Sequence, residues 1–220
     1  MSAINTSVFD PDCKDCLRLA AFLHQTARKH PDYHCAPVAP FGAPDARLVI
    51  VGLAPGMHGA NATGRPFTGD YAGILLYRTL FEFGFSNCPE SISRDDGLEL
   101  YDCRITNAVK CLPPKNKPQP DEIRRCNRYL ANELAQLPRG AVILGLGKIA
   151  HDAVVRALGL RTAPHPFEHG RIHPLTDGRT LVDSYHCSRY NTQTRRLTGE
   201  MFTAVFRSVQ NLLGGASSWR

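Results

Sequence analysis

The segment RLVIVGLAPGMHGANATGRPFTGDYAGILLYRTLFEFG, residues 47–84, predicts a strand, a loop and a helix in succession. Residues 47–56 form a β-branched run that ends in Gly and Pro, which is typical of a buried parallel strand followed by a loop. Residues 72–84 carry apolar side chains at helical spacing and end in a glycine, which predicts a helix with its C-cap. A strand that leads through a loop into a helix is the first half of a βαβ unit.

The same alternation continues along the chain. Further strands are predicted at 102–109, 140–147 and 179–188, and further helices at 120–137, 148–160 and 195–213, with Thr192 to Thr194 as capping residues of the last. Alternating strands and helices predict an α/β fold, a three-layer α/β/α sandwich around a four-stranded parallel sheet. We expect one domain over residues 1–220, with residues 1–46 as an N-terminal extension that holds a helix at about 15–29.

Ligands of open parallel sheets lie beyond the carboxyl ends of the strands. Three loops rich in Gly, Pro or His follow predicted strands, at 52–70, 107–118 and 186–194. The functional site is therefore expected where these loops meet.

Composition excludes several protein classes. With 43% apolar and 21% charged residues, the 220-residue chain is neither disordered nor fibrous. It has no apolar run of about 18 residues, and its first residues resemble no secretion signal, so we expect a cytoplasmic protein without a membrane partner.

Positive charge is concentrated in two segments. The net charge is +6, and residues 104–128 contribute +5 while residues 179–220 contribute +4, which leaves −3 for the remainder. This distribution of positive charge suits binding to a polyanionic partner.

The chain has eight cysteines. In a secreted protein they would suggest four disulfides, but the sequence shows no secretion signal, and in the cytosol clustered cysteines more often bind a metal. Cys13 and Cys16 form a CxxC pair, and Cys111 and Cys126 bracket a proline-rich loop. Four thiolates suit zinc or an iron–sulfur cluster equally well, and a redox-active CxxC pair is the alternative. The other four cysteines are expected to be small buried apolar residues: Cys35, Cys88, Cys103 and Cys187. Of these, Cys35 is the one rival ligand.

The loop at 51–73 contains six glycines, which would let backbone approach a ligand closely. It matches neither a Walker A loop nor GxGxxG. Asp70 could orient a water or cap the helix that follows, and capping is the more common role. Phe67 could stack on a planar base or simply anchor the loop.

The segment SYHCSRYNTQTRR, residues 184–196, places a histidine at the end of the fourth strand. His186 could be a structural hydrogen-bonding residue, but the Ser, Asn and three Arg that follow are typical of a loop that grips a phosphate backbone. His165, His169 and His173 are spaced for one face of a helix, but the surrounding Pro and Gly exclude a helix. We therefore interpret these three as loop residues.

Three motifs together, GLAPGMHGANATGRPFTGD, TNAVKCLPPKNKPQP…C and YHCSRYN, resemble the uracil-DNA glycosylase superfamily, most closely its family 5. The resemblance spans most of the chain, from Cys13 to about Leu197. It implies a DNA-repair glycosylase with an α/β/α sandwich. It also implies a [4Fe–4S] cluster on Cys13, Cys16, Cys111 and Cys126, which favours iron over zinc.

The resemblance implies roles for single residues. Phe67 would stack on the flipped base, Asn107 would read its edge and His186 would contact a base carbonyl. Asp70 matches a position proposed to orient the hydrolytic water. We expect four small residues to complete the base pocket: Gly52, Ala54, Gly56 and Ser188. Relatives elsewhere in the superfamily place an acidic or amide residue where this chain has Ala54, so the burden of water activation shifts to Asp70 and His186.

The implied activity is hydrolysis of the N-glycosidic bond of uracil, hypoxanthine or xanthine in double- or single-stranded DNA, leaving an abasic site. In this picture the damaged base lodges between Phe67 and His186. DNA contacts are expected from the loop after the fourth strand: Arg189, Tyr190, Asn191, Arg195 and Arg196. We expect a monomer that associates with the prokaryotic nucleoid during repair. The alternatives are a nucleoside or amide hydrolase and a non-catalytic module that binds damaged DNA.

Overall fold

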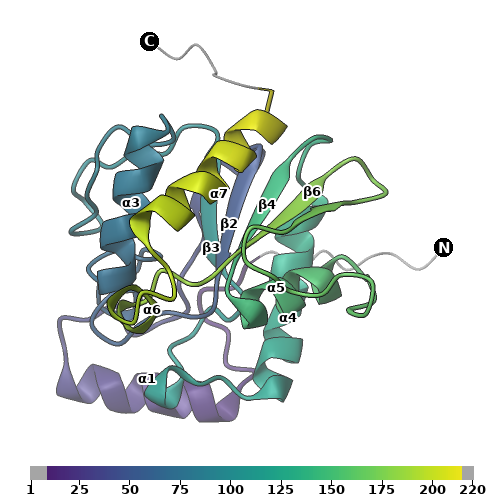
Figure 1. Cartoon of the computed structure of the whole chain (residues 1–220). Helices are drawn as coiled ribbons and strands as arrows, with labels where there is room; N and C mark the ends of the chain where they lie inside the picture. The colour runs from purple at the N-terminus through teal and green to yellow at the C-terminus, as the bar shows by residue number, and fades with distance from the viewer. Residues whose placement is uncertain (1–8, 215–220) are drawn as a thin grey trace.

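The computed structural model describes residues 9–214, and its central feature is a six-stranded sheet in the order β1-β3-β2-β4-β6-β5 (Figure 1). The strands are β1 (Phe41–Gly42), β2 (Leu48–Gly52), β3 (Cys103–Asn107), β4 (Val142–Leu146), β5 (Ile172–Pro174) and β6 (Thr180–Ser184). The four central strands run parallel, as predicted. The two edge strands, β1 and β5, pair antiparallel and were not predicted.

Helices cover both faces of the sheet, so the predicted three-layer sandwich is confirmed. The helices are α1 (Leu17–Lys29), α2 (Ala60–Thr63), α3 (Tyr71–Glu82), α4 (Pro120–Ala135), α5 (Lys148–Ala157), α6 (Arg189–Gln193) and α7 (Gly199–Leu212), with a 3₁₀ turn η1 at Pro114–Asn116. One hydrophobic core joins the sheet to α3 and α7, and a second joins it to α4 and α5. In Figure 1, α7 crosses the face of the sheet beside α3.

Burial explains why the central strands form. Every residue of β2 and β4 is buried, as expected for parallel strands covered on both faces. The parallel register pairs Gly52 at the end of β2 with Asn107 at the end of β3, which brings the loops after these two strands together.

Capping residues set the starts of the helices. Gln119 and Glu122 form a reciprocal capping box ahead of α4, which begins at Pro120. The expected cap for the last helix was wrong, because α7 begins after Thr198, whose side chain accepts from the Met201 amide. The preceding residues instead form the short helix α6, capped by Ser188.

No helix among residues 9–214 is long and apolar enough to cross a membrane.

Candidate functional site: a cleft at the carboxyl ends of the strands

A cleft of about 540 Å³ lies where the loops after β2, β3, β4 and β6 meet. This volume falls within the range of about 300–1,000 Å³ that is typical of small-molecule sites. Nine of the predicted site residues line it: Ala54, Gly56, Phe67, Asp70, Asn107, His186, Ser188, Arg189 and Tyr190. The expectation that these loops form one site is therefore supported by their placement.

Phe67 forms one wall of the cleft in an unusual backbone conformation. Its φ is +58°, a left-handed conformation that costs a non-glycine residue energy and is often found at functional sites. A Cβ on Gly52 would lie 2.6 Å from Cζ of Phe67 and 2.4 Å from Oδ1 of Asn107. Gly52 therefore acts by making room for these two side chains, and it does not line the cleft itself.

Asn107 ends β3 and is 4% exposed. Among residues 9–214 no side-chain hydrogen bond of Asn107 is found, and Asn107 borders the cleft. An amide supplies both a donor and an acceptor, which suits recognition of the edge of a base.

Asp70 has the predicted capping role. It precedes α3, and its Oδ1 accepts a 3.0 Å hydrogen bond from the Gly73 amide. Burial raises the pKa of this carboxyl despite the backbone hydrogen bonds that favour the ionised form. A Cβ on Gly59 would lie 2.7 Å from Oδ2, so a glycine is required there to accommodate the carboxylate.

His186 follows β6 and faces Phe67. Burial lowers the pKa of His186 to about 4, so its imidazole is neutral at physiological pH. Its Nδ1 is buried without a hydrogen-bond partner among the described residues. A neutral imidazole carries one proton, and a buried Nδ1 without an acceptor favours the tautomer with that proton on Nε2.

The two rings are close enough to correct one expectation. The centroids of Phe67 and His186 are 5.8 Å apart and their planes differ by 24°. A base sandwiched between two parallel rings needs about 7 Å, twice the contact distance of roughly 3.5 Å. A base entering this cleft would therefore meet both rings from the open side and would not lie between them.

The loop after His186 is held in place by its own side chains. Ser188 caps α6, and Nδ2 of Asn191 donates to the His186 carbonyl oxygen at 2.8 Å. Asn191 was predicted to bind DNA, and this stays a prediction; its amide nitrogen is engaged inside the loop. Tyr190, by contrast, is 70% exposed at the rim of the cleft.

The three arginines of this region are exposed, and two of them lie over tyrosine rings. The Arg189 guanidinium lies 5.3 Å from the centre of the Tyr71 ring, and that of Arg196 lies 4.7 Å from the centre of the Tyr185 ring. Arg195 is exposed and has a φ of +56°.

Sequence reasoning missed one wall of the cleft. The first turn of α5 contributes Lys148, Ile149 and Ala150. The only local signal in the sequence was Gly147, which lies between β4 and α5; in the structure its φ is +90°. Asn116 of η1 also lines the cleft; it lies in the predicted site loop 107–118 but was not singled out.

The four predicted ligand cysteines line a second cavity, between α1, α4 and the loop after β3. All four are free thiols. Burial and the neighbouring thiols raise the pKa of Cys16 to about 11 and also raise the pKa of Cys111. Thiolates in such a cavity need a cationic group to stabilise them, which fits a metal centre.

The spacing of the sulfur atoms also bears on which metal centre fits. Ligands of a single tetrahedral zinc, with Zn–S distances near 2.3 Å, lie about 3.8 Å apart. Among residues 9–214, the only three or more potential ligands within 4.8 Å of one another are His151, His173 and Asp183. The cysteine sulfurs are therefore spread more widely than a mononuclear zinc site requires.

The remaining cysteines lie elsewhere. Cys103 and Cys187 are buried as expected, whereas Cys35 and Cys88 are half-buried, and Cys35 has a φ of +44°. Cys35 does not line the cavity of the four cysteines.

The chain is similar in sequence to proteins of one known family. Residues 39–210 match the family model of the uracil DNA glycosylase superfamily. The chain is 49% identical over 207 residues to a type-5 uracil-DNA glycosylase of Thermus thermophilus, and the aligned region covers 92% of this chain and 94% of that protein. It is 42% identical over 200 residues to the type-5 enzyme of Pyrobaculum aerophilum (89% and 87% covered), and 37% identical over 179 residues to a type-4 enzyme of Archaeoglobus fulgidus (79% and 80% covered).

Proposed function

The chain belongs to the uracil-DNA glycosylase superfamily, and from this premise we propose that it excises uracil from DNA by hydrolysing the N-glycosidic bond. The observation that carries the proposal is the convergence of four groups in one cleft: the Phe67 ring, the free amide of Asn107, the carboxylate of Asp70 and the neutral imidazole of His186. A base inside a duplex cannot reach such a cleft, so the nucleotide must be extruded first, at a cost of a few kcal/mol.

The cleft provides recognition of the extruded base. Phe67 offers part of its ring for contact, and the Asn107 amide can donate to one polar atom of the base edge and accept from another. Ala54 leaves the cleft wide at the position where a larger side chain would narrow it. This width supports hypoxanthine and xanthine as further substrates.

Bond cleavage places negative charge on the departing base and positive charge on the sugar. The Nε2–H of a neutral His186 would donate to a base carbonyl and stabilise the negative charge in a site shielded from water. Asp70 would use Oδ2 to orient the attacking water, while Oδ1 remains bonded to the helix. The ionised carboxylate also favours the cationic sugar.

The product is an abasic site. A lyase step would need a deprotonated amine in the cleft, but Lys148, the lysine that lines it, is paired with Asp152 at 2.7 Å. The water-based route is therefore favoured over covalent catalysis by lysine.

DNA binding is assigned to the rim of the cleft. Tyr190 and Arg189 would enter the space that the extruded base leaves, and Arg195 and Arg196 would contact flanking phosphates. Such contacts make binding strongly dependent on salt. We propose that the protein works as a monomer, in the compartment that contains the genome.

Cys13, Cys16, Cys111 and Cys126 would hold a [4Fe–4S] cluster. Their free thiols, shared cavity and wide spacing support this assignment. The cluster would supply a structural cross-link that ties the N-terminal segment and the proline-rich loop to α4. The N-terminal 46 residues would then serve as part of a single domain, because they provide two of the four ligands.

The test is an assay for alkali-labile strand breaks on duplexes that contain uracil, hypoxanthine or xanthine. We expect salt-sensitive base release and no strand break before alkali treatment. Cleavage of free nucleosides without salt dependence would instead indicate a small-molecule hydrolase. Binding of damaged DNA without base release would indicate a non-catalytic module.

A further inference from the structure

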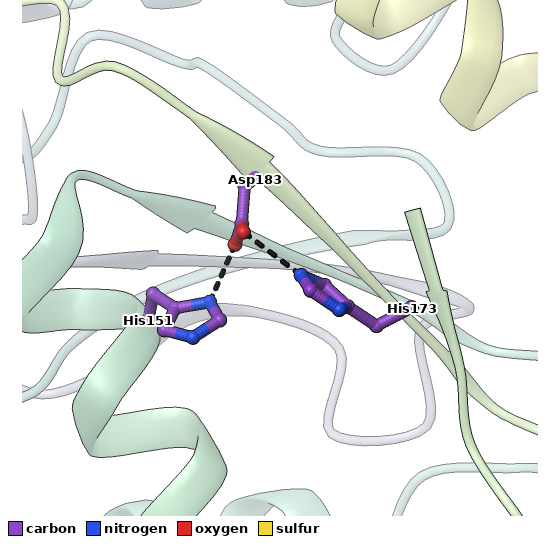
Figure 2. A group of neighbouring side chains, drawn as sticks. All are labelled: His151, His173 and Asp183. Atoms are coloured by element: carbon purple, nitrogen blue, oxygen red, sulfur yellow. Dashed lines mark hydrogen bonds and ion pairs between the residues drawn. The ribbon is translucent and has the colours of Figure 1, made fainter. Parts of the chain in front are cut away.

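A buried polar network links side chains of α5, β5 and β6, namely His151, His173 and Asp183 (Figure 2). Asp183 of β6 accepts hydrogen bonds on both carboxylate oxygens. Oδ1 lies 2.7 Å from Nδ1 of His151 on α5, and Oδ2 lies 3.0 Å from Nε2 of His173 on β5. All three side chains are at most 5% exposed. The sequence interpretation of His173 as a loop residue was therefore wrong.

The hydrogen-bond geometry determines the charge of His151. Its Nε2 lies 2.8 Å from the backbone carbonyl oxygen of His165, which can only accept, so Nε2 must carry a proton. A neutral His151 would then turn a bare Nδ1 lone pair toward a carboxylate oxygen at 2.7 Å, which is repulsive. A proton, carried by Nδ1 or by Oδ1, or a metal ion must therefore lie between these two atoms.

The separation favours a proton over a metal ion. Two ligands of one tetrahedral zinc lie about 3.3 Å apart, whereas charge-assisted N–H···O bonds measure about 2.7–2.9 Å. Oδ2 of Asp183 also faces two donors, His173 Nε2 and the Glu168 amide at 3.3 Å, as an ionised carboxylate would. His151 is thus an imidazolium paired with the Asp183 carboxylate.

The surroundings of His151 agree with this charge state. Burial alone would lower the pKa of His151, but the hydrogen bond and the attraction of Asp183 outweigh it, so the pKa lies above its ordinary value. The other titratable groups that face His151 are Asp152 on its own helix, the ring of His173, and His165 through its carbonyl. None of these is a lysine or an arginine.

The network joins two walls of the cleft. On α5, His151 directly follows the three residues of the first turn that line the cleft. On β6, Asp183 lies three residues before His186, and the intervening backbone is held by a 2.7 Å hydrogen bond from the Gly147 amide to the Ser184 carbonyl. A Cβ on Gly147 would lie 3.4 Å from Cβ of His186, so the backbone just before α5 runs close to His186.

We propose that Asp183 is a positioning residue for His186, and that it acts by pairing with a His151 that is protonated at neutral pH, so that the start of α5 and the end of β6 keep a fixed separation. The proposal rests on the proposed function, because it assigns His186 to base release. A displacement of a catalytic group by about 1 Å can lower a rate by roughly 100-fold. The charge pair therefore matters to catalysis although it touches no substrate.

The experiment combines ¹⁵N NMR of the histidine rings with single-turnover release of uracil from a duplex. In the wild-type protein we expect both ring nitrogens of His151 to be protonated at neutral pH. We also expect the rate of uracil release to fall at alkaline pH, together with the loss of that imidazolium signal. Asp183→Asn should abolish the imidazolium signal and lower the rate by about 10- to 100-fold, while affinity for an abasic duplex stays within about twofold.

Asp177→Asn is the matched control, because Asp177 belongs to the same β5–β6 hairpin but is exposed and pairs with Arg179 instead of a histidine. It should leave both the NMR signal and the rate unchanged. The wild-type titration needs no variant, so the test stands even if Asp183→Asn does not fold.

Three results would overturn the proposal: a neutral His151 in the wild-type protein at neutral pH, a folded Asp183→Asn with the wild-type rate, or a stoichiometric transition metal that the variant loses. Absence of uracil release from the wild-type protein would refute the proposed function instead. In that case the NMR result would still decide the charge of the network.

Discussion

Replacing Asp70 by asparagine separates its two roles. Oδ1 of Asp70 accepts from the Gly73 amide at 3.0 Å, and an asparagine side-chain oxygen can accept the same hydrogen bond. Asn and Asp are equally good N-caps. The substitution therefore keeps the cap of α3 and removes only the negative charge that faces the cleft.

The effect on stability follows from the raised pKa of Asp70. A carboxyl whose pKa is higher in the folded than in the unfolded state destabilises the fold when it is ionised, so this contribution to stability increases as pH falls through the folded pKa. At neutral pH, Asp70→Asn should consequently be at least as stable as the wild-type protein. Asp70→Ala loses the cap, which costs about 1 kcal/mol and lowers the melting temperature by roughly 2–4 °C in a protein of this size.

The two substitutions differ in their effect on stability, but they should lower the rate of uracil release alike. If Oδ2 orients water, both variants should release uracil about 100-fold more slowly in single-turnover assays. The wild-type rate should also fall as acid protonates Asp70, and Asp70→Asn should lack that acid limb. A wild-type rate for Asp70→Asn would show that this aspartate is a helix cap and nothing more.

Gly52→Ala should destabilise the fold by about 1–3 kcal/mol in a thermal melt, because the new Cβ would lie 2.4 Å from Oδ1 of Asn107. Gly199→Ala is the control, because a Cβ at Gly199 would have no neighbouring atom within 4 Å. His186→Ala should lower the single-turnover rate more than about tenfold while the circular dichroism spectrum is retained, and an unchanged rate would remove His186 from the mechanism. Cys111→Ser should bleach a brown protein and lower its melting temperature, whereas a colourless wild-type protein with stoichiometric zinc would contradict the cluster. Arg196→Ala should reduce the slope of log affinity against log salt by about one, and an unaltered slope would exclude a phosphate contact at this position.

Much of the fold could be predicted because its central strands are continuous apolar runs. The β2 and β4 segments are buried along their whole length, so their hydrophobicity signals their position directly. The edge strands β1 and β5 have two and three residues, and β5 ends in a proline. Such short strands form because a neighbouring strand offers free hydrogen-bonding groups, which is a tertiary effect that leaves no local pattern.

The order of strands and helices was enough to predict the residues at the strand ends of the candidate site, but not those that depend on how the helices pack. Parallel strands bring their carboxyl ends to one edge, so the meeting of Phe67, Asn107 and His186 in one cleft followed from the order of elements. The contribution of α5 did not follow, because the orientation of its first turn depends on packing against β4. The link between His151 and Asp183 was missed for the same reason, since 32 residues separate them and only the sheet brings them together.

The glycines of the 51–73 loop have a different role from the one that their number suggests. Their density predicts a backbone that approaches a ligand, but three of them make room for the chain itself. A Cβ on Gly73 would lie 1.9 Å from the Phe67 carbonyl oxygen, one on Gly52 would meet the Phe67 ring, and one on Gly59 would meet the Asp70 carboxylate. Phe67 is thus fixed from its backbone and from its ring in a conformation that it would not adopt alone. The loop uses its glycines to hold an aromatic ring and a carboxylate rigidly at the cleft, which is the preorganisation that a site for an extruded base requires.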